Sequence, residues 1–313
     1  MSDTKHSADS QKSVLITGGS GLVGKYLTSL LLSEGYRVSH LSRGTGQFGR
    51  VRVFRWDPDN NYIDPQALHG INYIIHLAGA NIGEKRWTKK RKDEIVWSRV
   101  DSSRLLYSEI VSHKIPLKGF ISASATGYYG SVTSDKLFAE SDPPADDFLG
   151  TTCLLWEEEA DLFSAVGIRT VKIRTAVVLE KSDAALARFL SAARFRLYPT
   201  LGSGKQFMPW IHISDLCRIY LKALNDEEMI GSYNAVAPDH SDNRRFVRTL
   251  AKVMNKPFLS LPVPSFLLRL IMGESSVIAL KGSRISSERI VSQGFRFEFP
   301  ELEGALADIL KSD

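Results

Sequence analysis

The stretch SVLITGGSGLVG (residues 13–24) decides the fold, because it joins a short apolar strand to a helix through a glycine-rich loop. Ser13 to Thr17 has the apolar composition of a buried strand, and Leu22 to Ser33 has the apolar spacing of a helix. Between them Gly18, Gly21 and Gly24 form a GxxGxxG pattern. This pattern is a variant of the GxGxxG loop that binds the pyrophosphate of dinucleotides.

Each glycine of the loop has a physical reason. Gly18 permits a tight turn, Gly21 lets the backbone approach a pyrophosphate, and Gly24 lets the helix pack close to the strand. The start of the helix adds free N–H groups and partial positive charge, which attract phosphates. The predicted dinucleotide site is therefore lined by Gly18, Gly19, Ser20, Gly21, Leu22, Val23 and Gly24. A glycine-rich turn without a ligand is the alternative.

The segment from residue 35 to 56 favours NADP(H) over NAD(H). An NAD site commonly has Asp or Glu about 20 residues after the glycine loop, at the ribose 2′-hydroxyl, and this segment has no acidic residue. Arg43 follows the predicted strand Arg37 to Leu41 and its neighbour Ser42, where a guanidinium is placed to clamp a 2′-phosphate. We interpret three further arginines as solvated surface: Arg50, Arg52 and Arg55. Asp57 either accepts a hydrogen bond from the adenine amine or starts the turn DPDN.

The first half of the chain alternates strand-like and helix-like segments. Helices are predicted for Trp87 to Val111 and Leu149 to Val166, and further strands for Val51 to Trp56, Tyr73 to Ala78, Phe120 to Ala123 and Arg169 to Arg174. This alternation predicts an α/β fold with a Rossmann-like, doubly wound parallel sheet. Ligands of such sheets lie beyond the carboxyl ends of the strands.

After about residue 180 the pattern changes to short helices and more prolines, which predicts a smaller, mostly helical C-terminal substrate or lid domain. Ser232 to Val236 is expected to return to the sheet as its last strand, so the two domains are interleaved. We predict a disordered tail at 1–12 and a dinucleotide-binding domain at 13–180 with 214–237. The substrate or lid domain is predicted at 181–213 with 238–313.

The composition excludes several classes of protein. The 313 residues carry a formal net charge of only +5, too small by itself to indicate a nucleic-acid or membrane partner. The two cysteines, Cys153 and Cys217, form no CxxC pair, and no spacing suggests a metal site. No apolar run reaches 18 residues, and the polar N-terminus is not a secretory signal. We expect a cytoplasmic protein with a small-molecule substrate, and an organellar location is left open.

With this glycine loop and the motifs that follow it, the chain resembles the extended, epimerase-like branch of the short-chain dehydrogenase/reductase superfamily. It is most similar to epimerase-family proteins of bacteria and organelles, described as nucleotide-sugar epimerases with a C-terminal domain of unknown function. The resemblance runs across nearly the whole chain and is carried by LITGGSGLVG, IIHLAGANI with RWTKKRK, SRVDSSR, ISASATGYYG, DDFLGTTCLLWE, RTAVVL, GSGKQFMPWIHISDL and GSRISSERIVSQGFRF. It implies that the cofactor is lined by Leu77, Ala78, Gly79 and Ser122.

The superfamily uses a Ser together with a Tyr and a Lys spaced YxxxK, in which the Lys lowers the pKa of the Tyr and holds the nicotinamide ribose. Ser124 matches the Ser, but Leu149 and Cys153 stand where the Tyr and Lys belong, and no YxxxK occurs in any register. Tyr128 and Tyr129 either take over the acid–base role or form a structural turn. Cys153 is interpreted as packing, with a reactive thiol as the alternative.

The substrate side is predicted from the segment at residues 202–210. Lys205, with its neighbour Gln206, is placed to contact an anionic group, and Trp210 is placed to stack on a ring. Arg86 and Trp87 match a family motif and are expected to reach the cleft. The rest of the basic run at residues 85–92 is interpreted as the solvated start of a helix, with an anion- or nucleic-acid-binding patch as the alternative.

Three further residues follow from the same motifs. His212 is interpreted as a structural residue rather than as a base. Asp215 is interpreted as a residue in the first turn of a helix whose N-cap is Ser214. Arg174 is expected to face the cleft. The superfamily often dimerises through the helix that corresponds to Trp87 to Val111, so the resemblance also allows a homodimer.

Two functions are consistent with these residues. The first is an NADP(H)-dependent oxidoreductase or epimerase acting on a small, anionic carbonyl or alcohol, with Ser124 orienting the reacting oxygen. The alternative is a non-enzymatic NADP(H)-binding sensor or regulatory protein, which the missing Tyr and Lys favour.

Overall fold

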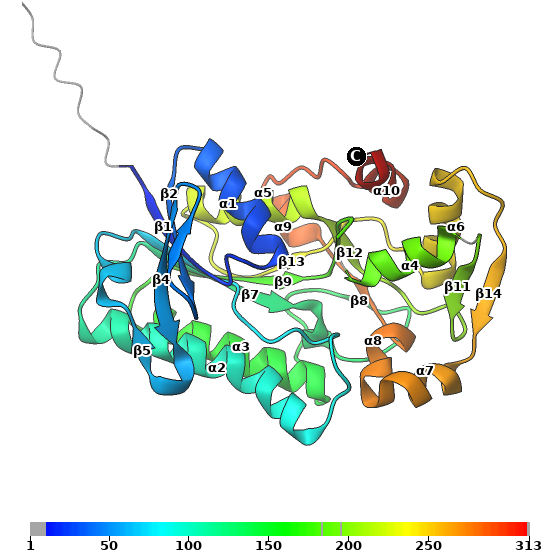
Figure 1. Cartoon of the computed structure of the whole chain (residues 1–313), viewed down its shortest axis with the longest axis horizontal. Helices are drawn as coiled ribbons and strands as arrows, with labels where there is room; N and C mark the ends of the chain where they lie inside the picture. The colour runs from blue at the N-terminus through cyan, green and yellow to red at the C-terminus, as the bar shows by residue number, and fades with distance from the viewer. Residues whose placement is uncertain (1–10, 183, 195, 312–313) are drawn as a thin grey trace, which may run out of the picture.

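The computed structural model describes residues 11–182, 184–194 and 196–311, so most of the predicted N-terminal tail lies outside the described residues. Its centre is a sheet with the order β13-β9-β7-β6-β1-β2-β4-β3 (Figure 1). Seven of its strands are parallel: β1 (Ser13–Thr17), β2 (Arg37–Ser42), β4 (Val51–Asp57), β6 (Tyr73–His76), β7 (Gly119–Ala125), β9 (Thr170–Thr175) and β13 (Gly231–Ala235). The sequence predicted all seven.

Two short strands at one edge were not predicted. β3 (Gly46–Phe48) and β5 (Tyr62–Ile63) both run antiparallel to β4. They are two or three residues long, so they show too little of the alternation that identifies a strand.

The strand order reverses between β1 and β6, because the chain runs outward through β2 and β4 before it returns to the other side of β1. Thr17 of β1 pairs with Leu41 of β2 on one side and with His76 of β6 on the other. The loops after these three strands therefore meet at one edge. A reversal of this kind opens the crevice in which doubly wound sheets bind their ligands.

Helices cover both faces of the sheet (Figure 1). One face carries α1 (Leu22–Ser33) and α5 (Ile213–Asn225), and the other carries α2 (Lys89–Ser112) and α3 (Phe148–Ala165). In β1, Ile16 belongs to the core under α1 and α5, whereas Leu15 belongs to the core under α2 and α3. Burial on both faces explains why this strand is a continuous apolar run.

The C-terminal part has a core of its own, to which Phe189, Trp210, Phe246, Leu250 and Leu306 contribute. Its helices are α4 (Ala184–Arg194), α6 (Asn243–Val253), α7 (Ser265–Met272), α8 (Val277–Leu280), α9 (Glu288–Ser292) and α10 (Leu302–Lys311). Three two-stranded pairs complete it: β10 (Val177–Leu179) with β12 (Trp210–His212), β11 (Tyr198–Leu201) with β14 (Ser260–Val263), and β8 (Leu137–Phe138) with β15 (Arg284–Ile285). The mostly helical C-terminal region is confirmed, and its boundaries stay a prediction.

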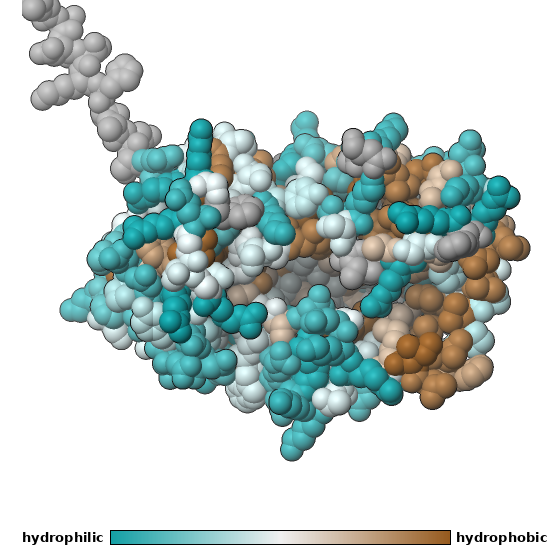
Figure 2. Space-filling view, in the orientation of Figure 1, coloured by the Kyte–Doolittle hydropathy of each residue, from teal (hydrophilic) through white to brown (hydrophobic). Residues whose placement is uncertain are grey.

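One surface of this region is apolar. Figure 2 shows it over α7, where Phe266, Leu270 and Ile271 are all more than 60% exposed. Within the described ranges no helix combines the length and the apolar character needed to cross a bilayer.

Candidate functional site

The glycine loop forms a tight turn that opens directly into α1. Gly18 has a left-handed φ of 69°, and the N–H of Gly21 donates to the carbonyl oxygen of Gly18 at 2.9 Å. Gly21 is the N-cap of α1, and no side chain caps the helix. The first turn of α1 therefore presents its N–H groups without a side-chain acceptor, which is the arrangement that binds phosphates.

Crowding explains why glycine is needed at two of these positions. A Cβ on Gly24 would lie 2.5 Å from the carbonyl oxygen of Gly18 and 2.6 Å from the Cα of Gly19. A Cβ on Gly18 would lie 3.0 Å from the carbonyl group of Leu77. Gly24 thus lets α1 pack against the loop itself, whereas the sequence predicted close packing against the strand.

A buried hydrogen-bond chain fixes the segment after β6. Thr17 Oγ1 accepts from the N–H groups of Leu77 and Ala78, both at 3.1 Å, so its own hydrogen goes to His76 Nδ1 at 2.8 Å. Burial lowers the pKa of His76 to about 3, so the ring is neutral and its Nε2–H donates to Ser102 Oγ at 3.2 Å. Leu77, Ala78 and the exposed Gly79 are therefore held beside the glycine loop.

On the other side of β1, the segment after β2 carries the predicted phosphate clamp. Ser42 ends β2 half-buried, and Arg43, which follows it, is exposed. Among the described residues Arg43 has no ion-pair partner, so its guanidinium is available to an anion. Asp57 Oδ2 accepts from Asn60 Nδ2 at 2.9 Å within the DPDN turn, which supports the structural alternative for Asp57.

The carboxyl ends of β7 and β9 meet in a buried ionic cluster. Arg174 forms two hydrogen bonds to the Glu157 carboxylate, at 2.8 and 2.9 Å. Ser124 Oγ donates to the same carboxylate at 2.7 Å. Glu157 is only 4% exposed, yet these contacts outweigh burial and lower its pKa. Glu157 is therefore a charged partner that fixes Ser124, and Arg174 faces this cluster.

The two tyrosines after Ser124 are both buried and lie in η3 (Thr126–Tyr129). Tyr129 donates to Asn234 Oδ1 at 2.7 Å and accepts from Arg174 Nη1 at 3.0 Å. Burial raises the pKa of Tyr129 to about 12 and also raises the pKa of Tyr128. The guanidinium carbon of Arg174 lies 3.4 Å from the centroid of the Tyr128 ring. These contacts support the structural alternative for Tyr129, and the acid–base role of either tyrosine stays a prediction.

Sequence reasoning did not assign a role to Glu157 or Asn234. Glu157 stands four residues after Cys153, hence on the same face of α3, and this spacing was the available signal. Asn234 lies in β13, far from Tyr129 in sequence, and only the sheet order joins them. Cys153 itself is buried and free, and burial raises the pKa of its thiol to about 12, which supports packing.

Two predicted substrate residues, Trp210 and Gln206, are buried. Trp210 is 1% exposed in β12, and its indole N–H donates to the carbonyl oxygen of Asp239 at 3.1 Å, so its burial argues against stacking on a ligand. Gln206 is 2% exposed, and its amide N–H groups bind the carbonyl oxygens of Leu201 and Ala279. Both side chains belong to the C-terminal structure. Lys205 is exposed, and its contact with an anionic group stays a prediction.

In the basic run at residues 85–92, some side chains are buried and others are exposed. Trp87 is buried, its ring meets that of Phe148 edge to face at a centroid distance of 4.8 Å, and its indole N–H donates to the carbonyl oxygen of Ile82. These contacts favour a packing role, and the substrate contact of Trp87 stays a prediction. Arg91 is also buried and pairs with Glu84 and Glu94. Arg86 is exposed and lies against Gly273 in the C-terminal region; a Cβ there would meet its Nε at 3.1 Å. Arg86 thus remains a candidate at the junction.

The start of α5 differs from the prediction. His212, not Ser214, is the N-cap: its Nδ1 accepts from the N–H of Ser214 at 3.2 Å. Asp215 is fully buried and accepts from the N–H groups of Glu298 and Phe299, at 2.8 and 2.9 Å. Asp215 therefore holds the C-terminal segment against α5, and the capping contact of His212 supports its structural interpretation.

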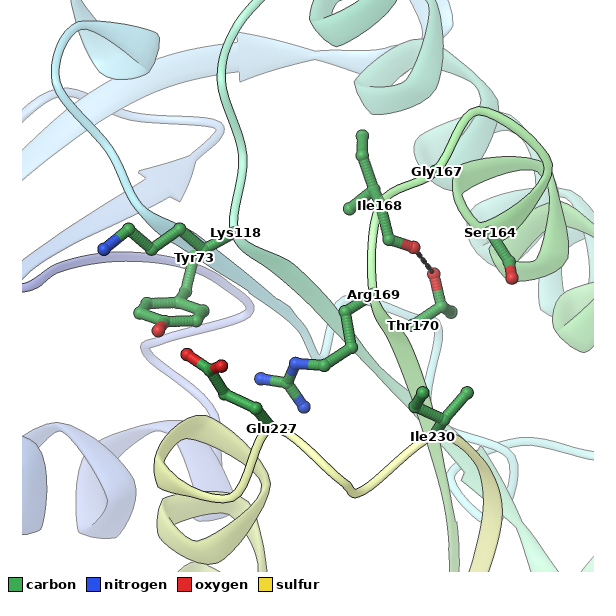
Figure 3. Close-up of a pocket in the computed structure, with 9 residues that line it drawn as sticks. All are labelled: Tyr73, Lys118, Ser164, Gly167, Ile168, Arg169, Thr170, Glu227 and Ile230. Atoms are coloured by element: carbon green, nitrogen blue, oxygen red, sulfur yellow. Dashed lines mark hydrogen bonds between the residues drawn. The ribbon is translucent and has the colours of Figure 1, made fainter.

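A pocket of about 540 Å³ lies at the opposite edge of the sheet, where β6, β7 and β9 begin. Figure 3 shows Tyr73, Arg169 and Glu227 converging in it. Arg169 uses its guanidinium to bind the carbonyl oxygens of Ala223, Asp226 and Met229 at the end of α5. This edge lacks the glycine loop, so we place the nucleotide site elsewhere. In the described part of the chain no three His, Cys, Asp or Glu residues are grouped to hold a metal.

Comparison with known proteins identifies the family. The model of the NAD dependent epimerase/dehydratase family matches residues 14–236, and that of DUF1731, a domain of unknown function, matches residues 263–309. The epimerase family protein YfhF of Bacillus subtilis is 34% identical over 300 residues, which cover 95% of this chain and 97% of that protein. The human epimerase family protein SDR39U1 is 32% identical over 302 residues, which cover 95% of this chain and 99% of that protein.

Solved structures agree with this assignment. The structure of human SDR39U1 (isoform2) with NADPH is similar with a TM-score of 0.84 and 29% identity, covering 96% of this chain and 100% of that chain. The structure of a nucleoside-diphosphate sugar epimerase from Corynebacterium glutamicum is similar with a TM-score of 0.76 and 28% identity. The match covers 96% of this chain and 58% of that chain. A UDP-glucuronic acid 4-epimerase from Bacillus cereus is only 20% identical, at a TM-score of 0.78, and shows the fold alone. With its glycine loop, sheet order and matched length, the chain belongs to the NAD-dependent epimerase/dehydratase family.

Proposed function

We propose that the chain binds NADP(H) along the carboxyl edge of its sheet and transfers hydride between the nicotinamide and a small, anionic carbonyl or alcohol. Arg43 carries this proposal, because it is an exposed guanidinium without an ion-pair partner among the described residues, one strand from the glycine loop. A bidentate contact to a 2′-phosphate would use that free charge. Human SDR39U1 was solved with NADPH, which supports the same choice of cofactor here.

The retained serine supports an oxidoreductase or epimerase. Ser124 Oγ gives its hydrogen to Glu157, so its lone pairs are left to accept a hydrogen bond from the hydroxyl of an alcohol substrate. Lys205 and Arg86 are exposed cations on the substrate side and fit an anionic group on that substrate. The bound cofactor would supply the hydride, and these residues would bind and orient the substrate.

Titration of intrinsic tryptophan fluorescence with NADPH and NADH tests the cofactor. We expect NADPH to bind at least about tenfold more tightly than NADH, since a charge-assisted contact to phosphate contributes about 1.5–3 kcal/mol. Arg43→Ala should abolish the preference, whereas Arg50→Ala, at another exposed arginine, should retain it. Equal affinities for the two cofactors in the unmodified chain would refute the NADP(H) proposal.

A second candidate function is a cofactor-binding regulatory protein without hydride transfer. The hydroxyl of Tyr129 is committed to Asn234 and Arg174, and the usual lysine is missing. NADPH deuterated at C4, incubated with a panel of carbonyl compounds, separates the two candidates. Stereospecific transfer of deuterium that is lost in Ser124→Ala would eliminate the regulatory role as the sole function. Tight NADPH binding with no transfer to any compound would favour it.

A further inference from the structure

Arg99 of α2 is a half-buried cation without a carboxylate partner. In the described part of the chain no Asp or Glu forms an ion pair with it, and its Nη1 donates only to the carbonyl oxygen of Ile95, one turn earlier, at 2.8 Å. The buried Arg91 on the same helix pairs with two glutamates, and Arg104 pairs with Glu159. Partial removal of a guanidinium from water costs free energy unless its N–H donors find acceptors, so an unpaired guanidinium indicates a missing ligand.

The guanidinium of Arg99 lies beside the segment after β6. A Cβ on Gly79 would be 2.9 Å from its Cζ and 3.2 Å from its Nε. The Arg99 side chain therefore packs directly against this loop, and Ser98 Oγ fixes the next residue by accepting from the N–H of Ala80 at 2.9 Å. This placement puts the cation at the same edge of the sheet as the glycine loop.

The same guanidinium faces α3 where the lysine of YxxxK is missing. It lies 4.9 Å from the ring centroid of Trp156, one turn after Cys153, the residue aligned with that lysine. The charge of Arg99 also favours the thiolate of Cys153, although burial dominates and raises the pKa of that thiol. A positive charge from α2 thus lies beside the turn of α3 that lacks the lysine.

We propose that Arg99 binds the nicotinamide half of the dinucleotide, by donating to its ribose hydroxyl oxygens, and so replaces the missing lysine as a cofactor-positioning residue. This inference depends on the proposed NADP(H) binding. The sheet order indicates how the dinucleotide would run across the sheet. Arg43 follows β2 on one side of β1, and Arg99 lies against the loop after β6 on the other side. A dinucleotide that crosses the strand-order reversal at β1 has one half on each side. The two arginines then bind opposite ends of one ligand.

Two ligands measured against one variant test this assignment. NADPH contains both halves, whereas adenosine 2′,5′-bisphosphate contains the adenine half with its 2′-phosphate and lacks the nicotinamide half. We expect Arg99→Gln to weaken NADPH binding at least about tenfold and to leave the affinity for the bisphosphate within about twofold. Arg43→Ala should weaken both ligands. Arg104→Gln, on the same helix but exposed and paired, is the matched control and should change neither.

Each other result has a definite meaning. If Arg99→Gln binds NADPH as the unmodified chain does, the inference is wrong and Arg99 has no role in cofactor binding. If it loses both ligands equally, Arg99 acts on the structure of the whole site and not on the nicotinamide half, which also contradicts the inference. If the unmodified chain binds neither ligand, the proposed function itself fails.

Discussion

At the scale of single residues, the carboxylate of Glu157 organises the buried cluster, because four polar or charged side chains surround it. It accepts from Ser124, Arg174 and Ser232, and Lys172 lies 3.7 Å away. A carboxylate with this many donors stays charged and does not exchange protons near neutral pH. The proton in any hydride-transfer reaction must therefore come from another group, such as Tyr128 or water.

Glu157→Gln should lower the free energy of unfolding by about 3–5 kcal/mol, because it leaves the charge of Arg174 buried without its partner. Glu158→Gln is the matched control: Glu158 is the next residue of α3 and is exposed, so its loss should cost less than about 0.5 kcal/mol. Denaturant unfolding of the three proteins measures the difference. Equal stability of the two variants would show that the cluster is not held by this carboxylate.

At the scale of elements, the joint between β1 and α1 is packed backbone against backbone. The contacts that a Cβ on Gly24 would make are with the carbonyl oxygen of Gly18 and with Gly19, which cannot move aside as a flexible side chain could. The glycines therefore allow α1 to start close to the loop after β1. Because no side chain caps α1, its first N–H groups are open to a phosphate.

Gly24→Ala should therefore destabilise the fold by about 1–3 kcal/mol through overpacking. Gly44→Ala is the comparison, because a Cβ on Gly44 has nothing within 4 Å and its change should stay within about 0.5 kcal/mol. Urea midpoints of both variants against the unmodified chain provide the measurement. A Gly24→Ala protein as stable as Gly44→Ala would mean that the loop can relax away from the helix.

At the scale of the whole molecule, burial of neutral histidines makes stability depend on pH. Burial is the largest cause that lowers the pKa of His40, His76, His212 and His240. A histidine with a lowered pKa takes up its proton more readily in the unfolded chain, so acid favours unfolding. The stabilisation is complete above the unfolded pKa of about 6.5 and is lost as the pH falls below it.

His76 alone, with its pKa lowered to about 3, should reduce the free energy of unfolding by about 1.4 kcal/mol between pH 7.5 and pH 5.5. Denaturant unfolding across this range measures the slope. His76→Gln should make the curve less steep than that of the unmodified chain. The same slope in both proteins would contradict the assignment to His76.

How far the sequence could predict this molecule depends on whether a feature is local. The strands and the glycine loop are local patterns of apolar spacing and glycine, and all seven parallel strands were predicted. The cluster of Glu157, Arg174, Tyr129 and Asn234 joins one helix, two strands and a turn, so no local pattern describes it. The burial of Trp210 was not predicted, because its motif resembles a ligand contact and only tertiary packing buries its ring.

The most direct test is the crystal structure of the chain with NADPH bound. We expect the pyrophosphate over the N-terminus of α1, the 2′-phosphate at Arg43 and the nicotinamide ribose at Arg99. The cofactor should lie at the carboxyl edge of the sheet, opposite the pocket of Tyr73 and Arg169. A dinucleotide bound in that pocket, or one at the glycine loop whose 2′-phosphate does not touch Arg43, would contradict the proposed cofactor site.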